Sequence, residues 1–339
     1  MSTESSAATT LTTADLTLVR ALQREPRATW TRVGAVVGTD ATTAARRWER
    51  LHKAGLAWLT AYVTPPTWTV GYVDLACTPD RLLAVGEEVC RWPPVFSVER
   101  TTSDHQLFLG IAARCYHAMD TLVTKRLGVI PGVRSVRMAV ATHIHREGGG
   151  WTVGPDQHEP SRTSLPLPQF WQDGSVRTIV DALGTDGRLS SAELARRCGV
   201  GESVVRRVLA RLLRNGELAF RCDLAHVAAG WPVIAGYRLD VPADVLDRVA
   251  AAVAALPETR LSAAVVGRGN LVVSTWLRNP ADTTGYEARL LRTAPGVRVL
   301  DRAVTLTMPK RMGRLLDQAG RAVGYQQILP AGGHPVPGG

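Results

Sequence analysis

The chain repeats itself, and this repeat constrains its fold more than any single motif does. Residues 15–63 align without a gap on residues 176–224, so that Leu22 corresponds to Leu183, 161 positions later. The correspondence continues beyond these segments at a nearly constant offset. An internal repeat of this length predicts one structural unit present in two fused copies.

Composition limits the number of domains and the class of partner. A chain of 339 residues with 45% hydrophobic residues can form several cores, and the repeat divides it into four domains. The formal charge of +10 and the isoelectric point near 9.9 favour a polyanionic partner such as double-stranded DNA. An Arg-rich composition that serves only solubility is the alternative.

Cysteine usage and hydropathy indicate the compartment. The five cysteines are odd in number and none forms a C-x-x-C pair, which argues against a disulfide framework or a zinc knuckle. No stretch approaches 18 uninterrupted apolar residues, and the start of the chain does not resemble a signal peptide. We therefore expect a cytoplasmic protein without a membrane partner.

The first part of each copy has the pattern of a helix-turn-helix domain. In copy one, Gly38 interrupts the helical spacing and Asp40 is placed to cap a new helix. That helix would bury Ala44, Trp48 and Leu51 at i, i+4 and i+7. The strand-like stretch that follows extends toward the next domain.

The second part of each copy reads strand, helix, strand, strand, helix, strand. This split βαβ order is typical of a ferredoxin-like sandwich, which has helices on one sheet face and a free face that can pair with another sheet. The fold class expected is α+β. The expected segments are a helix-turn-helix domain over 12–63, a ferredoxin-like domain over 67–146, a Gly/Pro-rich linker over 147–172, a second helix-turn-helix domain over 173–224, a second ferredoxin-like domain over 231–310 and a disordered tail over 326–339.

The third helix of each copy carries candidate DNA-binding side chains. A helix that enters the major groove needs donors for base edges near its start and for phosphates along its length. Arginine on a solvated helix face, or a helix-turn-helix that binds protein, is the alternative. The candidates are Thr42, Thr43, Arg46, Arg47 and Arg50 in copy one, and Ser203, Arg206, Arg207 and Arg211 in copy two.

These features together resemble the Lrp/AsnC family of leucine-responsive, or feast/famine, regulators. The resemblance rests on the turn and third helix over 37–56, followed by a ferredoxin-like pattern that closes with Pro131-Gly132-Val133. It implies a transcriptional regulator that assembles into oligomers and senses a small molecule, an amino acid or related metabolite, at the interface of its sensing domains. This chain looks like a fused tandem form.

The resemblance also points to an effector site. The family's loop between the second and third sensing strands usually shows a Gly and, three residues later, an Asp. Here copy one has Ser103 and Gln106, and copy two has Gly267 and Asn270. The loss of the carboxylate at both positions favours an effector other than a plain amino acid, or none.

Two other functions stay open. Proteins similar in fold to this family include sirohaem decarboxylases, and His143, His145 and Arg137 on one strand are the candidates for such an enzyme. A sensor that acts by protein contact alone is the other. No nucleophile elbow or phosphate-binding loop occurs, and the two histidines are more readily explained by packing than by metal ligation. We therefore expect no catalytic residues, no metal site and no cofactor.

Overall fold

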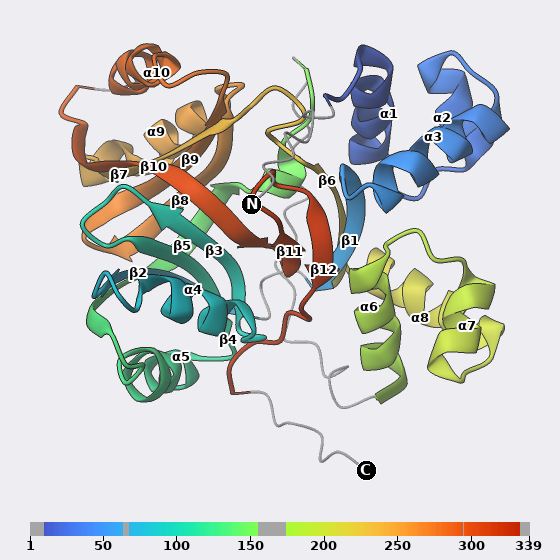
Figure 1. Cartoon of the computed structure of the whole chain (residues 1–339), viewed down its shortest axis with the longest axis horizontal. Helices are drawn as coiled ribbons and strands as arrows, with labels where there is room; N and C mark the ends of the chain where they lie inside the picture. The colour runs from blue at the N-terminus through green and yellow to red at the C-terminus, as the bar shows by residue number, and fades with distance from the viewer. Residues whose placement is uncertain (1–9, 64–67, 155–173, 294, 333–339) are drawn as a thin grey trace, which may run out of the picture.

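The computed structural model describes residues 10–63, 68–154, 174–293 and 295–332. A closed β-sheet with its covering helices forms one part, and six helices form the other, with a pair of strands between them (Figure 1). In the described ranges, no helix is long and apolar enough to cross a bilayer.

The first helix-turn-helix unit begins and ends its helices where local chemistry dictates. Thr12 and Asp15 form a reciprocal capping box at the first helix. Gly38, with a φ of 72°, ends the second helix, and the Asp40 carboxylate accepts a bond from the amide of Thr43 at 2.8 Å to start the third. The predicted break and cap are confirmed. The helices are α1 (Thr13–Arg24), α2 (Trp30–Val37) and α3 (Ala41–Lys53).

The second helix-turn-helix unit repeats this plan. Gly199, with a φ of 65°, ends the middle helix as Gly38 does, and the Ser190 side chain accepts a bond from the amide of Glu193 at its start. The helices are α6 (Gly174–Thr185), α7 (Ser191–Cys198) and α8 (Glu202–Arg214).

The strands that follow the two units pair with each other. β1 (Ala57–Val63) and β6 (Leu218–Leu224) are antiparallel over their whole length. Their side chains are exchanged between the halves: Val63 packs in the core of the second unit, and Leu224 packs in the core of the first. Since each core is completed by the other copy's strand, the two units form one body.

The sheet half has the same strand-helix order twice. The elements are β2 (Thr69–Cys77), α4 (Leu82–Cys90), β3 (Val95–Thr101), β4 (Leu107–Ala113), α5 (Tyr116–Leu122) with a π turn (Val123–Leu127), and β5 (Val133–Arg146), then β7 (Val233–Asp240), a 3-10 turn (Ala243–Val245), α9 (Leu246–Ala254), β8 (Thr259–Gly267), β9 (Gly269–Leu277), α10 (Asp282–Leu291) and β10 (Arg298–Arg311).

The expectation of two sandwiches with free faces is corrected by the strand pairing. β10, β3, β4, β2, β5, β8, β9 and β7 follow in this order, and β7 pairs again with β10, so the sheet closes on itself. Closure is possible because β5 and β10 are each 14 residues long. Each pairs first with its own half and then with the other half.

The closed sheet has an outer and an inner apolar layer. The helices cover its outer face, where Val73 and Leu75 pack with α4 in one half and Val249 packs with Leu271 in the other. The inner face carries a separate cluster that contains Tyr72 and Val265. The face expected to be free is therefore turned inward.

Two segments are more ordered than the sequence indicates. The expected linker begins with a 3-10 turn (Gly148–Gly150) and the buried Trp151, whose ring donates a bond to the Pro257 carbonyl at 2.8 Å; residues 155–172 of it lie outside the described residues. The tail expected to be disordered from residue 326 packs as far as residue 332, where Ala331 bridges to Ala113. Residues 333–339 are not among those described.

A further hairpin, absent from the predicted elements, joins the two parts of the molecule. β11 (Arg314–Leu316) pairs with β10, and β12 (Ala322–Tyr325) pairs with β11. The amide of Ala322 donates to the carbonyl of Gly55, at the turn between α3 and β1. The hairpin thus attaches the end of the sheet to the first helix-turn-helix unit.

Candidate DNA interface and ligand cavities

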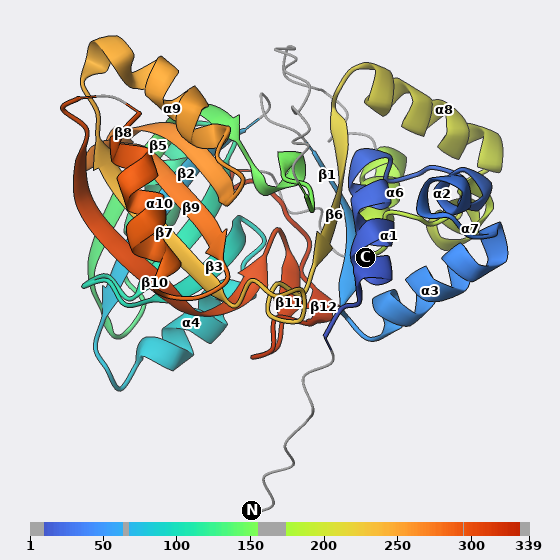
Figure 2. The ribbon, with the colours of Figure 1, turned by 90° about the horizontal axis from the view of Figure 1, so that it is seen from above.

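The two third helices lie apart on the helical side of the molecule (Figure 2). In α3, Thr42 and Arg46 are exposed, and Arg46 makes no ion pair among the described residues. The Thr43 hydroxyl donates to Asp40 at 2.7 Å. Arg50 Nη2 lies 2.6 Å from Asp15 Oδ1, whereas Arg47 Nε lies 3.9 Å from the same atom. Arg46 is therefore the arginine of α3 that is best placed for a ligand, and Arg50 is engaged inside its own unit.

In α8, different positions carry the ion-paired and the unpaired side chains. Ser203 is exposed at the start of the helix, and Arg206 pairs with Glu202 one turn earlier. Arg207 and Arg211 are exposed and make no ion pair within the part of the chain that the structure describes. The two helices consequently present different free donors.

A reciprocal pair of arginines joins the two helix-turn-helix units. Arg27 donates to the carbonyls of Gly187 and Leu189, at 2.5 and 3.0 Å. Arg188, 161 positions later, donates to the carbonyls of Pro26 and Ala28, at 2.7 and 2.8 Å. Burial lowers the pKa of both guanidinium groups. Each donates two bonds into the opposite unit, and this fixes the position of α3 relative to α8.

The four predicted effector residues do not form one site. Gln106 and Asn270 are equivalent positions of the repeat, and both hold backbone: Gln106 Oε1 accepts from the Cys77 amide at 3.0 Å. Asn270 pairs with both the amide and the carbonyl of Val241. Gly267 lies against Ala139, with no space for a Cβ atom. Of the four, Ser103 alone lines one of the cavities described below.

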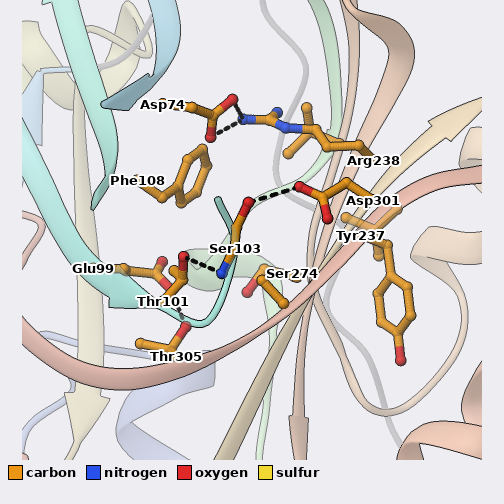
Figure 3. A pocket seen from close by; sticks show the side chains of 14 residues that line it. Asp74, Glu99, Thr101, Ser103, Phe108, Tyr237, Arg238, Ser274, Asp301 and Thr305 are labelled. Carbon is orange, nitrogen blue, oxygen red and sulfur yellow. Dashed lines mark hydrogen bonds and ion pairs between the residues drawn. The ribbon is translucent and has the colours of Figure 1, made fainter. Parts of the chain in front are cut away.

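A small cavity of about 50 Å³ lies where the two halves of the closed sheet meet (Figure 3). In it, Arg238 Nη2 donates to both carboxylate oxygens of Asp74, at 2.9 and 2.8 Å. The Ser103 hydroxyl donates to Asp301 at 2.9 Å. The Thr305 hydroxyl also donates to Glu99, so six of the nine polar side chains that line this cavity are bonded to one another and little of it is left to a ligand.

A larger cavity of about 130 Å³, the inner cavity, is lined by residues of the strand pair β1–β6 and of the inside of the closed sheet. Aromatic rings form much of its wall, and charged side chains form one end. Its lining includes Tyr62, Trp68, Tyr72, Phe96, Phe108 and Trp276, together with Glu99, Glu147, Arg221, Arg260 and Arg311.

One buried carboxylate organises the charged end of the inner cavity. Asp223 lies 2.8 Å from Arg221 Nη2, 3.2 Å from Arg260 Nη2 and 3.2 Å from Arg311 Nε. Burial alone would raise the pKa of Asp223, but the three guanidinium groups outweigh it and hold that pKa well below its usual range. Burial raises the pKa of the nearby Glu99.

No sequence pattern points directly to this cluster, because its members come from strands far apart in the chain. The arginine pair of the helix-turn-helix units is different: Arg27 and Arg188 stand at the repeat's own offset and could have been found by aligning the copies. The candidate enzyme residues are gathered only in part: the rings of His143 and His145 meet edge to face, with centroids 4.4 Å apart. Arg137 and His143 are exposed, His145 is buried with Nε2 3.4 Å from Asp247, and none of the three lines the cavities described above.

Three segments of the chain match known protein families. Residues 11–52 match the AsnC-type helix-turn-helix domain, and residues 71–150 match the Lrp/AsnC ligand binding domain. Residues 172–216 match the winged helix-turn-helix DNA-binding family.

Relatives cover the chain in two ways. An uncharacterised HTH-type transcriptional regulator of Pyrococcus abyssi is 28% identical over 138 residues, which is 40% of this chain and 87% of the relative. A second, from Pyrococcus horikoshii, is 20% identical over the same length. Among solved structures, the siroheme decarboxylase NirDL in complex with an iron-uroporphyrin III analogue has a TM-score of 0.58 at 13% identity, covering 87% of this chain and 92% of that one. At that identity the likeness is one of fold.

Proposed function

The chain belongs to the Lrp/AsnC family, and we propose that it is a sequence-specific transcriptional regulator whose two unlike helix-turn-helix units read DNA together. The single observation that carries this proposal is the rigid union of the two units. The exchanged strands β1 and β6 and the reciprocal Arg27 and Arg188 contacts hold α3 and α8 in one arrangement. Two reading helices at a fixed separation are what an operator with two half-sites requires.

The two half-sites should differ. Thr42 and Arg46 are exposed polar side chains of α3 that could contact bases, whereas α8 offers Ser203, Arg207 and Arg211. Base contacts specify sequence, so different donors at the reading positions select different bases. The operator is therefore asymmetric, unlike the palindrome that two identical subunits would read.

A tandem duplication explains the domain organisation of the whole chain. We infer helix-turn-helix domains over 12–63 and 173–224 and ferredoxin-like sensing domains over 67–146 and 231–310, joined by the segment 147–172. The two sensing domains close one sheet within a single chain, as two subunits of a homodimer would do together. We propose a cytoplasmic protein that assembles into homo-oligomers and responds to a small molecule.

The decarboxylase alternative has support from the fold alone. Its candidate residues on β5 do not converge on a cavity, whereas the regulator explains both exposed arginine sets. Co-purification of a coloured tetrapyrrole, or decarboxylation of sirohaem by the purified protein, would favour the enzyme instead.

The direct test is selection of genomic DNA fragments by the purified full chain, with non-specific competitor present. We expect a motif with two unlike half-sites, bound less tightly as salt rises because phosphate contacts release counterions. Arg46→Ala should relax one half-site and Arg207→Ala the other. Arg292→Ala, an exposed arginine after α10, is the matched control. Retention that is blind to sequence in the unmodified chain would refute the proposal.

A further inference from the structure

The inner cavity contains buried arginine donors without acceptors. Asp223 lies beside three guanidinium groups and cannot accept bonds from all of their nitrogens. Nη1 of Arg260 and both Nη1 and Nε of Arg311 are buried without a hydrogen-bond acceptor among the described residues, although Arg311 Nε lies 3.2 Å from Asp223 as an ion pair. Both side chains are 95% buried, at 5% exposure each. A buried donor without an acceptor costs free energy, so such donors in a cavity wall are suited to receive an anionic acceptor.

The carboxylates at this end of the cavity are already engaged with other groups. Arg221, Arg260 and Arg311 face three carboxylates, Asp223, Glu147 and Glu99. Asp223 is shared by all three arginines, Glu147 accepts a hydrogen bond from Tyr62, and Glu99, whose pKa burial raises, accepts one from Thr305. Burial lowers the pKa of Arg260 and of Arg311, which means that the surrounding protein does not compensate these two charges fully. An added carboxylate would do so.

The arginines are also held in place before any ligand arrives. The Arg260 guanidinium lies 3.8 Å from the ring centroid of Trp276 and 4.6 Å from that of Trp151. Arg311 lies 5.0 Å from Trp276, and its Nη2 donates to the Leu224 carbonyl at 2.7 Å. Rings that fix a guanidinium reduce the entropy that binding would otherwise cost.

The remainder of the cavity suits an apolar body. Away from the arginines its wall is formed by rings and aliphatic side chains, among them Val70, Tyr72, Phe96, Phe108 and Ile144. An apolar pocket with a few converging polar groups is the usual form of a small-molecule site.

We propose that the inner cavity binds a small organic carboxylate with an aromatic or branched apolar body, whose carboxylate is received by Arg260 and Arg311. This site is distinct from the loop positions Ser103, Gln106, Gly267 and Asn270.

If the proposed function holds, a ligand bound in the inner cavity affects the DNA-binding units through direct contacts. Arg311 contacts β6 through Leu224, and three residues later Arg314 donates to the Thr60 hydroxyl of β1 and to the carbonyls of Gly184 and Thr185 at the end of α6. A ligand bound to Arg311 therefore acts on a hairpin that contacts both β1 and β6.

The test uses the full chain without DNA, so that it is independent of the proposed function. Benzoate and phenylacetate are titrated by calorimetry and by thermal unfolding, beside their neutral amides. We expect the carboxylates to bind and to raise the unfolding temperature, and the amides to bind at least roughly tenfold more weakly, because they cannot supply the charge.

Two variants locate the site. Arg260→Met should weaken carboxylate binding by roughly tenfold or more, as loss of a buried charged contact does. Since that change could disturb the tryptophan contacts, Ile144→Trp fills the cavity and leaves the arginines intact; Val266→Trp, on an exposed position of β8, is its matched control. Absence of carboxylate binding to the unmodified chain, equal binding of the amides, or full binding by a folded Ile144→Trp variant would each overturn the proposal.

Discussion

Arg238 donates two hydrogen bonds to Asp74, and the two residues are 164 positions apart, which is the repeat's offset in the sheet half. They therefore occupy equivalent positions in the two copies, and they contact each other where the two halves of the closed sheet meet. In a homodimer, equivalent positions carry the same residue, so this contact would join like charges. The pair favours association of the two unlike halves of one chain.

A double-mutant cycle should measure this preference. Asp74→Asn and Arg238→Met each remove the ion pair, whose side chains are only 28% and 14% exposed. We expect a coupling free energy of about 1–2 kcal/mol, above the value typical of surface pairs. Urea unfolding of the four proteins gives it. The exposed pair Arg298–Asp240 serves as control, and a coupling no larger than that of the control would show that Asp74 and Arg238 do not set the pairing.

The reciprocal arginines predict a loss of cooperation between reading helices. With Arg27→Met and Arg188→Met combined, four hydrogen bonds between the units disappear. Affinity for a duplex with both half-sites should fall by roughly tenfold or more, while affinity for one half-site stays nearly unchanged, because the cost of positioning the second unit is then part of binding. Fluorescence anisotropy with the two duplexes separates these effects. An equal loss on both would indicate damage within each unit instead.

The sequence was informative where structure depends on neighbours in the chain. Gly38 and Asp40 end one helix and start the next by local backbone geometry and capping, and both roles were predicted. The exchange of Val63 and Leu224 between cores was not, because a strand pattern does not reveal its partner. The same reason explains why two open sandwiches were expected: the crossing of β5 and β10 into the opposite half is a long-range event.

The candidate site was predicted unevenly. Exposed arginines on α3 and α8 follow from helical spacing, but their pairing does not: Arg50 is held by Asp15, which has no counterpart in the second copy, where Val176 stands. The charged end of the inner cavity requires Asp223, Arg260 and Arg311, which three separate strands bring together. No motif spacing encodes such a cluster.

The free energy of unfolding should fall in mild acid because the folded chain keeps His226 neutral. Burial, aided by Arg311, lowers the pKa of this imidazole to about 3 in the folded chain. The pKa of the same imidazole in the unfolded chain is near 6.5, so between about pH 6.5 and about pH 3 the unfolded chain binds a proton that the folded chain does not. The neutral His226 therefore makes its full contribution to the free energy of unfolding above about pH 6.5, and this contribution is lost as the pH falls toward about 3. His226→Phe keeps a ring beside Trp276 but removes the titration.

The comparison between these two proteins isolates the histidine from the other acidic groups. From about pH 7 to about pH 5, the unmodified chain should lose about 2 kcal/mol more unfolding free energy than His226→Phe does. Urea midpoints at both pH values provide the measurement. A difference that is independent of pH would mean that His226 can take up a proton without unfolding.

The turn between β10 and β11 contains backbone strain that can be relieved. Met312 has a φ of 46° and Gly313 a φ of 76°, as a two-residue hairpin turn with both central residues at positive φ requires. A residue with a Cβ atom is strained there, so Met312→Gly should raise the unfolding free energy by about 0.5–1 kcal/mol, after the extra entropy of glycine in the unfolded chain is subtracted. Gly313→Ala should act in the opposite direction, because a Cβ atom there would lie 2.6 Å from the Gln326 carbonyl oxygen. Thermal unfolding of both variants decides the matter: destabilisation by Met312→Gly would show that contacts of the methionine side chain outweigh the strain at its backbone.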